Sequence, residues 1–123
     1  MNIFEYDLVI YPMKVWVAFG EADFSDEFCW EDGEPAITDI SKDANYEGNV
    51  LGTVVEIETK KAGIILHFKN KKSLSPDIVA HESCHAAKKV FEFIGADINP
   101  HEPFEYLLSY IVKCVLDAKK GGK

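Results

Sequence analysis

The stretch that decides the fold reads SPDIVAHESCHAAKKVFEFIG and runs from Ser75 to Gly95. Ser75 is a suitable N-cap, Pro76 fits the first helical position, and Gly95 is a typical C-terminal stop. Between these ends, apolar residues recur at the spacing of a helix that buries one face. The pattern therefore predicts a helix over residues 75–95.

This helix carries one HExxH motif, His81-Glu82-Ser83-Cys84-His85. Histidines four residues apart lie on one helix face, so two imidazoles can bind one Zn²⁺ ion. The glutamate beside the first histidine can then act on the water that the metal carries. Chance gives the motif in a chain this short at roughly the one-per-cent level. The helical setting favours a metal site over an ordinary pair of surface histidines. We interpret Cys84, which lies inside the motif, as a small buried residue.

Strand-like segments, dense in β-branched and aromatic residues, fill the part of the chain before this helix. Pro12 removes a ladder donor from the first of them, which predicts an edge strand or two short strands there. The predicted strands cover residues 8–19, 50–58 and 64–68, with a weaker candidate at 24–30 and a short one near Ile37 and Thr38.

A hairpin turn is predicted between the last two strands, with Gly63 at the position that needs a positive φ.

After the motif helix, an apolar stripe predicts a second helix over residues 102–119. The chain is then a single domain over residues 1–123, with a β-rich part at 1–72. We expect an α+β fold in which a small antiparallel sheet is followed by two packed helices, as in a minimal zincin.

The composition argues against several kinds of partner. The chain has 123 residues, a formal net charge of −8 and a pI of about 4.9. With no basic stripe we expect no nucleic-acid partner, and no apolar run reaches membrane-spanning length. Three cysteines at unpatterned spacing, without a signal-peptide pattern, are typical of reduced thiols in a cytoplasmic protein.

A catalytic zinc site needs three protein ligands and one open position. Glu92 lies on the face of the two histidines but about 10 Å beyond His85 along the axis, which is too far to share one ion. The start of the second helix offers His101, Glu102 and Glu105. Each has an ordinary alternative, because acids favour helix starts and a loop histidine is commonly a surface residue. The residues alone leave the third ligand open.

Several stretches resemble the small HExxH proteins encoded by tailed bacteriophages and prophages, which are described as zinc metallopeptidases. The likeness is specific over residues 76–112 and looser over Tyr11-Pro12 and residues 15–17. The stretches that carry it are residues 80–87, Phe91, Ile94-Gly95, residues 102–106 and Tyr110-Ile111.

The resemblance implies a minimal zincin of the gluzincin kind, with Zn²⁺ held by His81, His85 and Glu102. Glu82 would be the general base that takes a proton from the metal-activated water and passes it to the leaving amine. Tyr106, the tyrosine of the same pattern, is the candidate donor to the oxyanion.

The expected function is therefore zinc-dependent cleavage of an amide bond in a peptide or protein substrate. We expect residues 64–68 to form the edge strand on which the substrate aligns, a partner chain to complete a shallow cleft, and a location in the cytoplasm of an infected or lysogenic bacterial host. Two alternatives stay open: a metal-binding protein without catalysis, and a phage-encoded interaction module that uses Phe24, Phe28 and Trp30.

Overall fold

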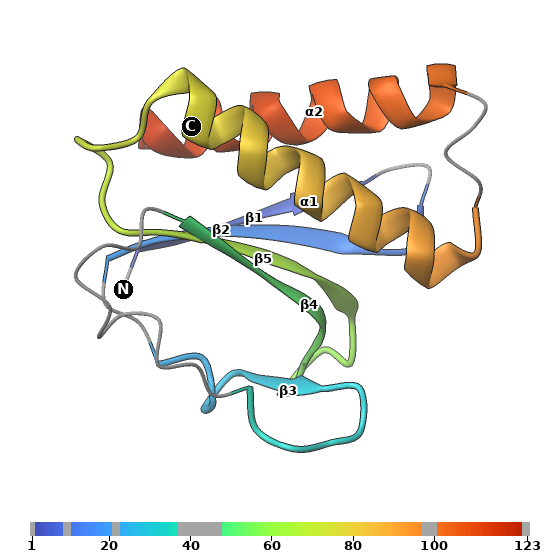
Figure 1. Cartoon of the computed structure of the whole chain (residues 1–123). Coiled ribbons are helices and arrows are strands. Elements are labelled where there is room, and N and C mark those ends of the chain that lie inside the picture. The colour runs from blue at the N-terminus through green and yellow to red at the C-terminus, as the bar shows by residue number, and fades with distance from the viewer. Residues whose placement is uncertain (1, 9–10, 21–22, 37–47, 97–100, 122–123) are drawn as a thin grey trace.

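The computed structural model describes residues 2–8, 11–20, 23–36, 48–96 and 101–121, without the side chains of residues 2, 101 and 102. Within these ranges a sheet is followed by two helices that cover one of its faces, which confirms the predicted α+β fold (Figure 1). The elements are β1 (Asn2–Asp7), β2 (Lys14–Phe19), β3 (Phe28–Trp30), β4 (Gly48–Glu56), β5 (Ala62–Phe68), α1 (Pro76–Ile94) and α2 (His101–Lys119).

The strands lie in the order β1-β2-β5-β4-β3. All neighbours are antiparallel except β2 and β5, which run parallel, so the sheet is mixed rather than wholly antiparallel. A parallel pair needs a long crossover, and the chain between β2 and β5 provides it by forming β3 and β4 first. This order makes β5 a central strand, so the prediction that residues 64–68 form an edge strand is wrong.

The predicted strand over residues 8–19 begins only at Lys14, because the residues around Pro12 form the connection from β1 to β2. Backbone hydrogen bonds from Leu8 N to Met13 O and from Tyr11 N to Leu8 O close this connection. Strand β1 was not predicted, and it is the partner of β2 at one edge of the sheet. The short strand expected near residues 37 and 38 lies outside the described part of the chain.

Gly63 has a different role from the one predicted. The positive φ of the β4–β5 turn falls on Lys60, at 63°, whereas Gly63 lies inside β5. A Cβ atom at Gly63 would lie 2.2 Å from the Lys14 carbonyl oxygen and 2.6 Å from the Trp16 ring. Glycine is therefore needed there because β2 approaches too closely for any side chain.

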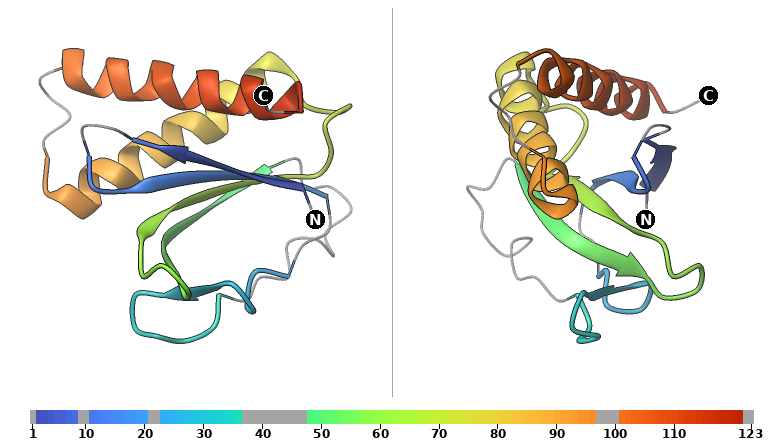
Figure 2. Two further views of the ribbon diagram at one scale, coloured as in Figure 1. Left: turned by 180° about the vertical axis from the view of Figure 1, so that it is seen from behind. Right: turned by 90° about the vertical axis from the view of Figure 1, so that its right-hand side faces the viewer.

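The sheet separates two hydrophobic clusters. One lies between the sheet and the helices, and the other lies under β3 on the opposite face, around Trp16, Phe28 and Ile65. Figure 2 shows β3 at the end of the sheet farthest from the helices. Strands β2 and β5 contribute side chains to both clusters, so they are the rigid centre on which α1 rests.

The two helices pack antiparallel. The rings of Phe91, near the end of α1, and Phe104, near the start of α2, have centroids 5.4 Å apart. At the opposite ends, Lys119 Nζ donates to the Leu74 carbonyl oxygen at 2.9 Å. The start of α2 therefore lies beside the end of α1, and this direction decides which side chains of α2 can reach the motif.

Candidate metal centre

Helix α1 starts and ends where its sequence predicts. Ser75 is the N-cap residue, Pro76 is the first helical residue, and Gly95 takes the left-handed conformation at φ 72°. The Ser75 hydroxyl donates to the Asp77 carboxylate instead of capping a backbone N–H. The buried face of the helix consists of Val79, Ser83, Ala86, Ala87, Val90 and Phe91.

His81 and His85 lie on the opposite, outer face of α1, and the side chain of His81 is 68% exposed. Their Nε2 atoms are 3.2 Å apart. Two nitrogen ligands at about 2.0–2.1 Å from a tetrahedral Zn²⁺ lie roughly 3.3 Å apart. The distance between the two nitrogens therefore matches that of two ligands of one zinc ion, and it equally matches a direct hydrogen bond between the two imidazoles.

Glu82 lies between this pair and the sheet. Its carboxylate Oε2 is 3.9 Å from His81 Nε2, and only 13% of its side chain is exposed. A Cβ atom at Gly48, the first residue of β4, would lie 2.8 Å from Glu82 Cγ. Gly48 thus leaves the space in which the Glu82 side chain lies beside the histidines, a role that the sequence pattern did not indicate.

The third ligand that the resemblance implies, Glu102, lies in the first turn of α2, and its side chain is outside the described residues. Phe104 is part of this turn, and its ring contacts that of Phe91 near the end of α1. The first turn of α2 therefore lies beside the end of α1. His81 is about 15 Å from Phe91 along the α1 axis at 1.5 Å per residue. The helix direction therefore places the start of α2 at the far end of α1 from His81, and the two are not brought together.

Tyr106 does not face the histidine pair either. It shares one side of α2 with Tyr110 and Asp117, and this side is turned toward β1. The Tyr110 hydroxyl donates to the Asp7 carbonyl oxygen at 2.7 Å, and the Tyr6 hydroxyl donates to Asp117 at 2.7 Å. Tyr106 itself is 71% exposed. This placement does not support its predicted role as an oxyanion donor.

Among the residues whose side chains are described, no three histidine, cysteine, aspartate or glutamate side chains form a group that could hold a metal ion. Glu105 and Glu92 are exposed, and Cys84 is half-buried within α1. The side chain of His101 lies outside the described residues, as that of Glu102 does. The described part of the candidate site thus consists of two adjacent imidazoles and one carboxylate.

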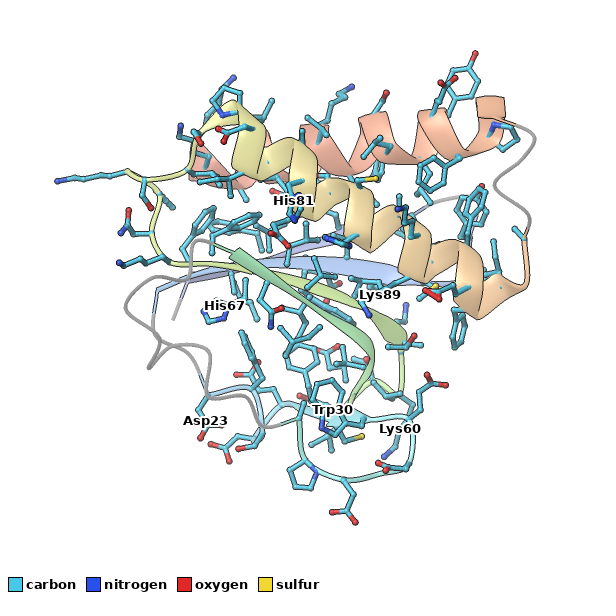
Figure 3. All side chains as sticks on the ribbon, in the orientation of Figure 1. Asp23, Trp30, Lys60, His67, His81 and Lys89 are labelled. Carbon is cyan, nitrogen blue, oxygen red and sulfur yellow. The ribbon has the colours of Figure 1, made fainter. Side chains whose placement is uncertain are left out.

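Beside this centre runs a strand edge that the sequence did not indicate. In the part of the chain that the structure describes, strand β3 pairs with residues 54–56 of β4 and with no other residues of that strand. Residues 48–53 of β4 have β5 on one side and no described strand on the other. Figure 3 shows His81 and Lys89 along the same side of α1, above β4. The outer face of α1 therefore adjoins the open edge of β4, which is the edge of residues 48–53 that none of the described strands covers.

Comparison with protein-family models, curated proteins and solved structures found no match to this chain. Within the described ranges, neither helix is long and apolar enough to cross a lipid bilayer.

Proposed function

We propose that this chain is a zinc-dependent metallohydrolase, a peptidase of the minimal zincin kind, with its centre on the outer face of α1. One observation carries the proposal: the Nε2 atoms of His81 and His85 lie 3.2 Å apart with the Glu82 carboxylate 3.9 Å from the first of them. A structural metal site has no need of such a carboxylate, whereas hydrolysis needs a base at this place.

In this proposal His81 and His85 hold the metal through Nε2. A bound Zn²⁺ would supply Lewis acidity, which lowers the pKa of a coordinated water toward neutrality and polarises a carbonyl group. Glu82 takes the proton of the attacking water and delivers it to the leaving amine. Its side chain lies over Gly48, where a Cβ atom would come within 2.8 Å of Glu82 Cγ, so the carboxylate adjoins the start of β4.

The proposal requires a third protein ligand. Glu102 stays the candidate that the resemblance favours, and His101 and Glu105 remain its rivals. Since the described helix direction separates the start of α2 from His81, a partner chain that docks on the exposed face of α1 is the other source of a ligand. Measuring zinc affinity in His101→Ala, Glu102→Ala and Glu105→Ala, with Glu58→Ala as an exposed acid elsewhere, distinguishes these sources. Loss of affinity in one variant identifies the ligand on α2, and unchanged affinity in all of them favours a ligand from a partner chain.

The substrate we propose is an extended peptide that adds to the open edge of β4 at residues 48–53. Strand addition uses main-chain hydrogen bonds for affinity, and this edge passes directly beside Glu82. The net charge of −8 favours basic peptides through the general field of the protein.

A second function deserves a test because His81 is 68% exposed. A metal ion bound by so exposed a histidine would also suit a role without catalysis, in which the ion joins two chains. The two functions differ in their dependence on Glu82. Catalysis requires its carboxylate, whereas a metal that only joins chains does not.

The experiment that tests the proposal compares the wild type with Glu82→Gln, an isosteric change, after loading with zinc. Both proteins should bind about one zinc per chain, and only the wild type should cleave a peptide library, with products identified by mass spectrometry. Equal cleavage by both proteins would remove Glu82 as the base. Zinc binding without any cleavage, together with zinc-dependent dimerisation, would favour the binding role.

A further inference from the structure

An open pocket of about 420 Å³ lies where the second half of α1 faces the junction of β3 and β4. It contains two carboxylates and one ammonium group, and Phe93, 42% exposed, forms an apolar wall. The residues that line it are Glu31, Gly52, Thr53, Lys89, Glu92 and Phe93. The histidine centre does not account for this pocket, since none of its residues belongs to the motif.

Lys89 lies flat over β4 because residue 52 is a glycine. A Cβ atom at Gly52 would lie 3.2 Å from Lys89 Cδ and 2.5 Å from Ile64 Cδ1. The aliphatic part of the Lys89 side chain is thus packed on the strand. Its single positive charge is outnumbered by the two carboxylates of Glu31 and Glu92. The pocket has a formal charge of −1, which favours a cation.

The open edge of β4 leads directly into this pocket. In the antiparallel pairing of β3 with β4, Trp30 is opposite Val54, so Glu31 comes where the pairing stops. A peptide that pairs antiparallel with residues 48–53 runs in the same direction as β3 and begins where the pairing of β3 with β4 stops. Its amino end then meets the pocket, and its later residues pass Gly48 and Glu82. From Gly52 to Gly48 the distance is about 13 Å at 3.3 Å per residue, or roughly four peptide residues.

We propose that this pocket is the subsite for a cationic group of the substrate, about four residues on the amino side of the cleaved bond. The cation is either a free α-amino terminus or a Lys or Arg side chain, and Glu31 and Glu92 bind it while Phe93 covers it. This inference rests on the proposed function, and it adds a substrate class to it.

The test uses zinc-loaded full-length protein and a library of decapeptides in two forms, one with free and one with acetylated amino termini. Mass spectrometry of the products gives the residues that precede each cleaved bond. We expect enrichment of Lys or Arg, or a requirement for the free amine, at about the fourth position before that bond. Loss of the preference on acetylation identifies the α-amino group, and its retention identifies a side chain.

The variant Glu31→Gln/Glu92→Gln should lower kcat/KM for the preferred cationic peptide by about three- to tenfold, as expected for two partly exposed charge pairs. The decrease should be smaller for the same peptide with norleucine in place of the cation, because that peptide loses no charge pair. Glu58→Gln is the matched control, because Glu58 is an exposed acid outside the pocket.

Cleavage without a preference for cations, or a preference that survives in the double variant, would overturn the subsite while the proposed hydrolase stands. If the zinc-loaded wild type cleaves neither form of the library, both proposals fall together.

Discussion

Replacing Gly48 by alanine should separate catalysis from metal binding. The added Cβ would lie 2.8 Å from Glu82 Cγ and 3.0 Å from the Phe68 ring, closer than ordinary contacts allow. Phe68 is fully buried, so Glu82 is the side chain that must move. A displacement approaching 1 Å can cost about 100-fold in rate, and we expect turnover to fall by roughly 10- to 100-fold. Overpacking should cost about 1–2 kcal/mol of unfolding free energy.

The assay combines peptide cleavage, zinc stoichiometry and urea denaturation of the same preparations. Val54→Ala is the matched control on the same strand, because Val54 is buried in the cluster around Trp16 and Phe28, outside residues 48–53 and away from Glu82. Zinc content should stay at the wild-type level in both variants. The reasoning would be refuted if Gly48→Ala cleaved peptides as fast as Val54→Ala.

Three further predictions concern the fold and its ionisable groups. Gly63→Ala should destabilise the protein by about 3 kcal/mol or more in urea denaturation, because its Cβ would lie 2.2 Å from the Lys14 carbonyl oxygen; an unchanged midpoint would contradict the close β2–β5 approach. Burial lowers the pKa of His67 below its ordinary 6.5, so the unfolded chain binds more protons as the pH falls. Unfolding free energy should then decrease on acidification below pH 6.5, by at most about 1.4 kcal/mol per pH unit from this group, and an equally steep dependence in His67→Asn would exclude it. Burial raises the pKa of the Cys114 thiol to about 11, so iodoacetamide at pH 8 should label Cys114 only after unfolding, and rapid labelling of the native protein would contradict this.

The sequence predicted those features that depend on neighbours along the chain. Helix α1 has its predicted ends because Pro76 and Gly95 act locally. The convergence of His81 and His85 follows from their spacing of four residues, which alone places them on one face. Such signals need no knowledge of the rest of the fold.

Features that depend on distant parts of the chain were missed or misplaced. Gly63 looked like a turn residue because nothing near it in sequence indicates that β2 passes beside it. Strand β5 looked like an edge because the parallel pairing with β2 depends on a long crossover. The role of Tyr106 was predicted from a resemblance alone and stays a prediction, whereas the side of α2 on which it lies follows from the contacts of Tyr110 and Asp117 with β1.

The most direct test of the central claim is the zinc content of the wild type, His81→Ala and His85→Ala, measured by elemental mass spectrometry after dialysis against a weak chelator. The wild type should hold about one zinc per chain, and each variant should lose it while keeping its helical circular dichroism. If all three proteins held the same amount of zinc, or none, then His81 and His85 would not form a metal centre.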